Sequence, residues 1–340
     1  MDKMAKITYN ICVLIVTYSN RWQFLEQVLK GVTALENVTD VIVVDNASTY
    51  SVAQNCALLQ DARIKVITNT ENLGSAGGYK AGLEYFMKQT EANFVWLLDD
   101  DNLPVPEALE KLTEIWPTIP AADHQKALFS LRPDRRQHVR VAQGEDANRF
   151  FLVRNSFMGF NLFRIPVNQY YKLREKFIKP GPVREKAPMP YAPYGGMFFH
   201  KELVNLIGYP EAEFFVYADD SEYTYRMTEK GATIWLIPSS QITDIDKSYG
   251  IKYVKKVWRS IYLDLWNFRT YYQVRNSVYF YDRVNVSNSV IYGLNKWLFL
   301  KGQWIISKLT GKEENYKKLL IAIKDGLSAK LGMVNPEKYS

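Results

Sequence analysis

Residues 94–103 read FVWLLDDDNL, an apolar run that ends in three consecutive aspartates, Asp99, Asp100 and Asp101. The apolar part suits a strand in the interior of a sheet. Adjacent carboxylates repel each other and gain nothing from burial, so the cluster needs either open water or a cation. The run therefore predicts a buried strand whose carboxyl end carries concentrated negative charge.

Three other apolar runs precede this strand. They read ICVLIVTY at 11–18, DVIVVDNAS at 40–48 and RIKVITN at 63–69, with helical patterns between them. Strands that alternate with helices in this way predict an α/β fold, with a mostly parallel sheet and helices on both of its faces. Ligands of such sheets bind beyond the carboxyl ends of the strands.

Polar residues follow each predicted strand and should converge on one crevice: Thr17, Asp45, Asn72 and Asp99 to Asp101. Carboxylates supply hard oxygen ligands that suit Mg²⁺ or Mn²⁺ bridging a diphosphate. The alternative for the three aspartates is a solvated strand end that caps the next helix. The glycines of NLGSAGGY at 72–79 match neither the dinucleotide fingerprint nor the P-loop, which disfavours both of those chemistries.

The net charge of +7 is concentrated in the last quarter of the chain. From residue 251 onward there are 16 Lys and Arg against 6 Asp and Glu, together with Trp258, Trp266, Trp297 and Trp304. Basic aromatic helices are expected on an anionic membrane surface, although these tryptophans could instead pack helix against helix. No uninterrupted apolar run reaches the roughly 18 residues of a membrane-spanning helix, so we expect a cytoplasmic protein.

Six motifs in order carry a family resemblance: VTYSNR, VVDNAS, NLGSAGGYKAG, WLLDDDNLP, GGMFFHKE and FFVYADDSEYTYRMTEKG. Together they resemble the family 2 glycosyltransferases, which have the GT-A fold. The chain is most similar to bacterial galactofuranosyl- and rhamnosyltransferases of polysaccharide biosynthesis, and RTYYQVRNSVYF and IKDGLSAKLG extend the likeness. We therefore expect a GT-A nucleotide-sugar domain over residues 1–248 and a helical C-terminal domain over residues 249–340.

The resemblance implies a role for each matching residue. Asp99 and Asp101 form the family's metal-binding D-x-D motif, and Asp100 would face the donor sugar or ribose. Asp220 occupies the position of the general base. Asp219, Gly195 and Gly196 lie toward the acceptor. The nucleotide-sugar set is Thr17, Tyr18, Arg21, Asp45, Asn72, Gly74, Asp99 and Asp100.

One departure concerns the metal site. Family members often carry a histidine ligand after the base, whereas the corresponding stretch here, IWLIPSSQITDIDKSYG at 234–250, has none. Asp244 falls nearest that position. It could ligate Mn²⁺ or Mg²⁺ through oxygen, or it could cap the following segment.

The chemistry of sugar transfer fits this set of residues. A metal can neutralise the departing diphosphate, and a carboxylate on the opposite side can take the proton of the acceptor hydroxyl, which implies inversion at the anomeric carbon. The alternative for ADDSEYTYRM at 218–227 is a helix start that Asp219 or Asp220 caps.

We therefore expect an inverting, metal-dependent glycosyltransferase. UDP-galactofuranose is the first choice of donor and dTDP-rhamnose the second; the expected acceptor is a lipid-linked cell-surface glycan, such as O-antigen or capsule, at the inner face of the cytoplasmic membrane. A nucleotidyltransferase should have a glycine-rich basic loop where this chain has VTYSNR. A non-catalytic binding module would not explain the acidic crevice, which repels nucleic acid, so we expect no nucleic-acid partner.

Overall fold

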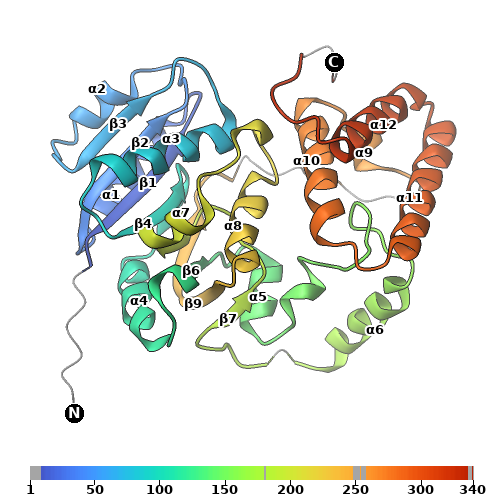
Figure 1. Cartoon of the computed structure of the whole chain (residues 1–340), viewed down its shortest axis with the longest axis horizontal. Helices are drawn as coiled ribbons and strands as arrows, with labels where there is room; N and C mark the ends of the chain where they lie inside the picture. The colour runs from blue at the N-terminus through green and yellow to red at the C-terminus, as the bar shows by residue number, and fades with distance from the viewer. Residues whose placement is uncertain (1–8, 180, 248–252, 254–257, 336–338, 340) are drawn as a thin grey trace.

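The computed structural model describes residues 9–179, 181–247, 253, 258–335 and 339. Figure 1 shows an α/β half and a helical half side by side. The strands are β1 (Ile11–Thr17), β2 (Val38–Asp45), β3 (Ile64–Thr68), β4 (Phe94–Asp99), β5 (Asn102–Pro104), β6 (Lys126–Leu131), β7 (Ala187–Met189), β8 (Met197–His200) and β9 (Thr233–Asp244). The helices are α1 (Trp22–Thr33), α2 (Val52–Ala57), α3 (Gly74–Gln89), α4 (Ala108–Ile115), α5 (Arg136–Ala142), α6 (Arg164–Phe177), α7 (Lys201–Ile207), α8 (Asp219–Glu229), α9 (Ile261–Asp264), α10 (Phe268–Val284), α11 (Ser289–Thr310) and α12 (Glu313–Leu327).

The strands form one sheet in the order β3-β2-β1-β4-β8-β6-β9-β5, and β7 pairs with β9. The first four strands of this order are parallel, whereas β8 runs antiparallel to both of its neighbours. The register pairs Asp45 with both Thr17 and Thr68, and Val16 with Asp99. The carboxyl ends of four strands thus meet at one edge, which confirms the predicted α/β sheet.

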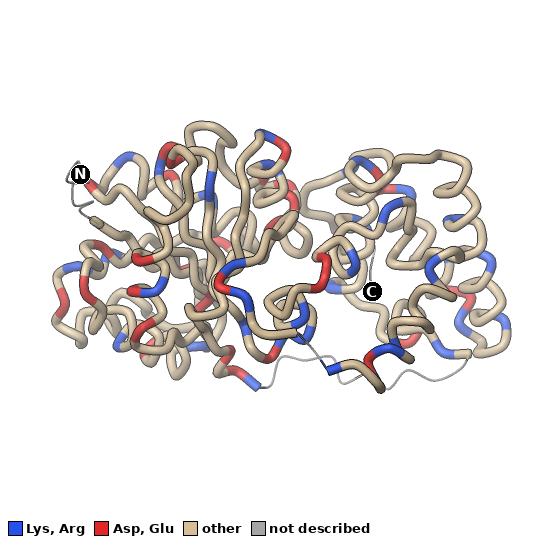
Figure 2. The backbone as a smooth tube through the Cα atoms, turned by 90° about the horizontal axis from the view of Figure 1, so that it is seen from below, with Lys and Arg blue, Asp and Glu red and all other residues tan. Residues whose placement is uncertain are grey.

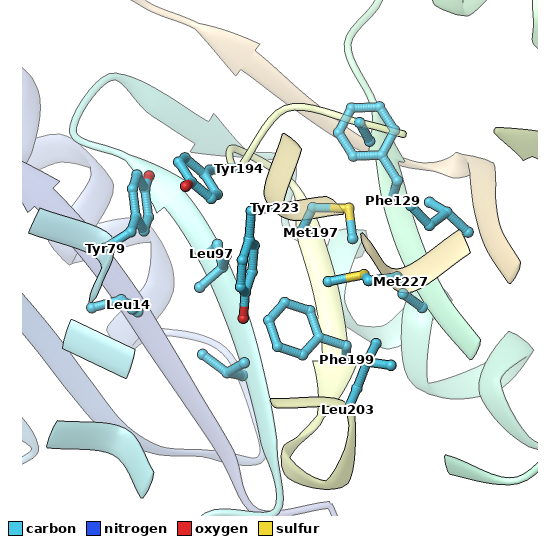
Figure 3. Packing of buried hydrophobic residues seen from close by; sticks show 14 of the residues in the cluster. Leu14, Tyr79, Leu97, Phe129, Tyr194, Met197, Phe199, Leu203, Tyr223 and Met227 are labelled. Atoms are coloured by element: carbon cyan, nitrogen blue, oxygen red, sulfur yellow. The ribbon is translucent and has the colours of Figure 1, made fainter. Parts of the chain in front are cut away.

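Helices cover both faces of the sheet, because successive residues of each buried strand point to opposite sides. Ile11, Val13 and Ile15 of β1 pack in one core cluster with apolar residues of α1 and α4. Cys12 and Leu14 belong to the other cluster, with α3, α7 and α8. Figure 3 shows this second cluster, in which Tyr79, Tyr194 and Tyr223 lie among Leu97, Phe199 and Met227.

The C-terminal helices α9 to α12 have a third cluster of their own, built on Leu263, Tyr271, Tyr272 and Leu319. Phe157, from the segment before α6, is buried in the same cluster. The predicted helical C-terminal region is therefore present, while the predicted boundary at residues 248 and 249 lies outside the described residues. In the described parts of the chain, no helix combines the length and the apolar character needed to cross a bilayer.

Candidate active site

A cavity of about 1010 Å³ opens at the carboxyl ends of β1 and β4. Segments between Val16 and Arg269 form its wall, including Phe268 and Arg269 of α10. The structure brings ten of the predicted site residues into this wall: Tyr18, Arg21, Asn72, Gly74, Asp99, Asp100, Asp101, Asp219, Asp220 and Asp244.

Asp99 and Asp101 have the two more exposed side chains of the triplet, whereas that of Asp100 is buried. The Asp99 side chain is 43% exposed, and its Oδ1 accepts a 2.9 Å hydrogen bond from the Tyr79 hydroxyl. Burial, together with the charges of Asp99 and Asp100, raises the pKa of Asp101 to about 7. Two repelling carboxylates on alternate residues of a cavity wall would be stabilised by a cation, and their hard oxygens suit Mg²⁺ or Mn²⁺.

Asp100, in contrast, points into the protein. The Thr17 hydroxyl donates to its Oδ2 at 2.7 Å, and Arg21 Nε donates to its Oδ1 at 2.7 Å. Burial raises the pKa of Asp100 to about 6, against the opposing effect of Arg21. Arg21 also pairs with Asp101 at 3.2 Å and Asp246 at 2.7 Å. Arg21 thus ties the aspartate triplet to the segment after β9, and both oxygens of Asp100 are engaged by protein groups.

Replacing Arg21 by Ala should lower the free energy of unfolding by about 3–5 kcal/mol. The reason is that Asp100 and Asp246 would stay buried without the Arg21 guanidinium, which contacts both carboxylates. Equilibrium urea unfolding measures this change. Lys30→Ala in α1 is the control, since the Lys30–Glu26 ion pair is exposed and should contribute less than about 1 kcal/mol. Equal losses in the two variants would contradict the assignment of Arg21.

Asp244 lies at the end of β9, where two arginines engage it. Its Oδ2 accepts from Arg132 and, at 2.7 Å, from Arg135, while its Oδ1 accepts from the Asn102 amide at 3.0 Å. Arg132 also reaches to 4.0 Å from Asp99. Across the described ranges, no cluster of three or more His, Cys, Asp or Glu side chains is arranged to hold a metal ion. Asp99 and Asp101 therefore fit a divalent cation best, whereas Oδ2 of Asp244 is already engaged by two arginines.

Asp219 and Asp220 begin helix α8. The Ser75 hydroxyl donates to Asp219 at 2.7 Å, and the Ser221 backbone N–H donates to Asp220 at 2.6 Å. Burial and the neighbouring charge of Asp220 raise the pKa of Asp219 to about 8. Burial also raises the pKa of Asp220, although the hydrogen bonds from Ser221 favour its ionised form. Burial therefore disfavours charge on both carboxylates at once, and the hydrogen bonds from Ser221 favour the charge on Asp220.

The turn at 72–74 is held by Asn46, which directly follows β2. The Asn46 amide donates to Asn72 Oδ1 at 3.0 Å and to the Gly74 carbonyl at 2.9 Å, and its Oδ1 accepts from the Leu73 backbone N–H. Gly74 has a φ of 70°, which glycine adopts freely. Asp45 is 5% exposed and accepts from the Ser48 backbone N–H.

Four predicted residues lie behind the cavity wall that the described residues define: Thr17, Asp45, Gly195 and Gly196. At Gly195 a Cβ would lie 1.9 Å from Asn102 Oδ1 and 2.7 Å from Asp99 Oδ2. Gly196 has a φ of 107°. Close packing behind Asp99 thus requires glycine at 195, and the backbone conformation favours it at 196.

Several residues of the wall were not predicted from the sequence, among them Tyr79, Arg132, Arg135, Phe268 and Arg269. A signal existed for the arginines, because RPDRR at 132–136 follows β6, whose carboxyl end meets the same edge as β9. Phe268 and Arg269 had no comparable signal, since only tertiary packing brings α10 to the cavity.

Residues 12–171 match the sequence model of glycosyl transferase family 2. A comparison with curated proteins finds no match.

Three solved structures share the fold. GalNAc-T7 with UDP, GalNAc and Mn²⁺ is 14% identical with a TM-score of 0.56, over 96% of this chain and 58% of that one. The mannosyltransferase PcManGT of Pyrobaculum calidifontis, with GDP-Man and Mn²⁺, is 15% identical with a TM-score of 0.52, over 96% and 77%. TarS 1–349 of S. aureus with UDP-GlcNAc is 16% identical with a TM-score of 0.52, over 94% and 81%.

The chain spans less than two thirds of some of these proteins, including 58% of GalNAc-T7 and 36% of another TarS chain. Such identities show a common fold, which is the predicted GT-A type, a mixed α/β sheet with helices and a helical C-terminal region. The sequence match covers residues 12–171, just under half of the chain. This part of the chain is therefore similar to glycosyl transferase family 2.

Proposed function

We propose that the protein is an inverting, metal-dependent enzyme that moves a sugar from a nucleotide sugar to a hydroxyl of a growing glycan. The observation that supports this most is a single cavity with Asp99, Asp101 and Asp220 in its wall. UDP-galactofuranose is the proposed donor and dTDP-rhamnose the alternative, both from the sequence resemblance. The ligands of the solved structures, UDP, UDP-GlcNAc and GDP-Man, support a nucleotide sugar as the donor class.

Asp99 and Asp101 are the proposed ligands of Mn²⁺ or Mg²⁺, and Asp244 is the proposed third. Because two arginines engage Oδ2 of Asp244, that residue would have to bind through Oδ1. The ion, when bound, supplies positive charge for the departing diphosphate. Tyr18, Asn72 and Gly74 are proposed to contact the nucleotide. Arg21 and Asp100 in the same wall, and Thr17 and Asp45 behind it, are proposed to support them.

Asp220 is the proposed general base, which accepts the proton of the acceptor hydroxyl as that hydroxyl attacks. The Ser221 N–H and hydroxyl hold one of its oxygens, at 2.6 and 3.1 Å. Asp219, whose pKa burial raises, is proposed to act beside it on the acceptor. Gly195 and Gly196 are proposed to keep the backbone close to the sugars.

A panel of nucleotide sugars tests this function. Incubated without acceptor, the protein should slowly release the nucleoside diphosphate from its own donor, and only when Mn²⁺ or Mg²⁺ is present. Release from UDP-galactofuranose alone would support the first proposed donor, whereas release from dTDP-rhamnose would favour the alternative. Metal-independent release, or release from no nucleotide sugar, would contradict the proposal.

The proposed acceptor is a lipid-linked glycan, which would place the enzyme on the cytoplasmic face of an anionic membrane. Helix α11 has three lysines and no acidic residue, and it turns apolar side chains to solvent. Trp297 is 60% exposed and Trp304 40%, whereas Trp266 packs against the C-terminal cluster. Lys and Arg residues recur along the C-terminal helices (Figure 2). The exposed side of α11 includes Val290, Leu294, Trp297, Lys301, Trp304, Ile305, Lys308 and Leu309.

The double variant Lys301→Glu/Lys308→Glu should bind anionic vesicles at least about 10-fold more weakly than the wild type, because each lysine near the surface contributes about 1 kcal/mol. Flotation with phosphatidylcholine vesicles, with and without phosphatidylglycerol, measures this. Leu58→Ser, at an exposed apolar residue of the α/β half, is the control. Concentration-dependent dimerisation without flotation would assign the α11 surface to a second copy of the chain instead.

A further inference from the structure

The turn that leads into α8 is strained. Three of its residues, Phe215, Tyr217 and Ala218, have φ values of 65°, 68° and 60°. Phe215 has a ψ of −69°, and the Val216 N–H donates to the Phe214 carbonyl at 2.8 Å, so this residue forms the rare left-handed γ-turn. Such conformations of non-glycine residues persist only where surrounding contacts impose them. The contacts that hold this turn therefore also determine where Asp219 and Asp220 lie.

Asn276 of α10 supplies the main contact. Its side-chain nitrogen lies 2.9 Å from the Phe214 carbonyl oxygen, 2.8 Å from that of Val216 and 2.9 Å from that of Tyr217. The two amide hydrogens are thus shared among three carbonyls of the strained turn. Asn276 is completely buried, so water cannot replace these hydrogen bonds.

Arg275 orients this amide and binds the same turn. Its Nε donates to Asn276 Oδ1 at 2.8 Å, and its terminal nitrogen donates to the Phe214 carbonyl at 3.2 Å. Arg275 is also completely buried. Behind it, α12 approaches so closely that a Cβ at Gly326 would lie 2.4 Å from the Arg275 carbonyl oxygen. The C-terminal helices therefore hold the Arg275–Asn276 pair rigidly.

The other side of the turn rests on the start of α3. The Phe215 carbonyl accepts from the Ala76 backbone N–H at 3.2 Å, and a Cβ at Gly74 would lie 1.9 Å from the same oxygen. The Ser75 hydroxyl, in the same helical turn, donates to Asp219. The strained turn thus lies between the proposed nucleotide-binding end of α3 and the buried pair of α10.

We propose that Asn276, oriented by Arg275, is a positioning residue that sets Asp220 at its place in the cavity. The C-terminal helices then serve the transfer reaction as well as the proposed membrane contact. This inference rests on the proposed role of Asp220 as the general base.

Asn276→Ala tests the proposal against a matched variant, Asn295→Ala. Asn295 of α11 is equally buried, but it binds the Asn155 carbonyl and the Leu162 N–H instead of the turn. Asn276→Ala should lower kcat about 100-fold, the effect of a misplacement of about 1 Å, with unchanged Mn²⁺-dependent affinity for UDP. Asn295→Ala should keep kcat within about 2-fold at a comparable loss of thermal stability. Equal kcat values in the two variants would overturn the positioning role.

Asn276→Ser keeps one donor and provides the test if Asn276→Ala does not fold. Its kcat should be about 10-fold below that of the wild type, which is an intermediate value between the wild type and Asn276→Ala. A wild-type kcat in folded Asn276→Ser would overturn the proposal. Asp220→Asn distinguishes the proposed general base from the proposed positioning residue. Wild-type activity of Asp220→Asn would overturn the role of Asp220 as the base. If Asp220→Asn is inactive but the Asn276 variants are fully active, only the positioning role of Asn276 is overturned.

Discussion

Asp220→Asn is expected to lower kcat by about 10³-fold, within the range that a general base contributes. Asparagine has nearly the same shape and can still contact the acceptor hydroxyl, but it cannot take the proton. The KM for the donor should stay near that of the wild type, because Asp220 lies at α8 and not among the proposed metal ligands. Steady-state kinetics with a saturating acceptor measures both quantities.

The pH dependence of the same two proteins gives a second readout. A base must be deprotonated to act, so the wild-type kcat/KM should fall as the pH drops through the pKa of Asp220, which burial raises above its ordinary value. Asp220→Asn should lack this acidic limb. Glu222→Gln is the control on the same helix, because Glu222 pairs with Arg226 at 3.0 Å and should change kcat less than about 3-fold. Full activity in Asp220→Asn would contradict the proposed role of Asp220 as the general base.

Asp101→Asn is expected to lower kcat/KM by about 100-fold or more at a fixed Mn²⁺ concentration, because the variant loses one of the carboxylates that would hold the ion against the diphosphate. A higher Mn²⁺ concentration should restore part of the activity. Wild-type activity should disappear with EDTA and return on addition of Mn²⁺.

Asp134→Asn is the control for this experiment. Asp134 follows the same strand as Arg132, but its side chain is 38% exposed and pairs with Arg135 at 3.1 Å. It should change kcat/KM less than about 3-fold, as expected of an exposed ion pair. Activity that resists EDTA, or equal kinetics of the two variants, would contradict the proposed metal site.

The N-terminal half of the sheet could be predicted from the sequence because its strands are continuous apolar runs that end in polar residues. Parallel neighbours place all their carboxyl ends at one edge, so the strand pattern alone was enough to assign Asp99 and Asn72 to one crevice. The orientation of a single side chain at a strand end is harder to predict. Thr17 ends β1 as predicted, yet its hydroxyl turns to Asp100 and away from the cavity.

Contacts between distant segments could not be predicted, because they depend on how loops pack. Arg21 and Asp246 are 225 residues apart, and Arg132 and Asp244 are 112 apart. Each of these residues would suit a solvated surface equally well when judged by composition alone. Asn276 lies in the segment RTYYQVRNSVYF, which carries part of the family likeness, but only the packing of α10 on the turn at 214–218 indicates a role for its amide.

A calorimetric titration of UDP into the wild-type protein, with and without Mn²⁺, tests the proposed metal site most directly. UDP is expected to bind only with Mn²⁺; Asp101→Asn should lose this binding, and Asp220→Asn should keep it. Equal UDP binding without the metal, or unchanged binding in Asp101→Asn, would contradict the claim that the aspartate triplet holds the ion of a nucleotide sugar.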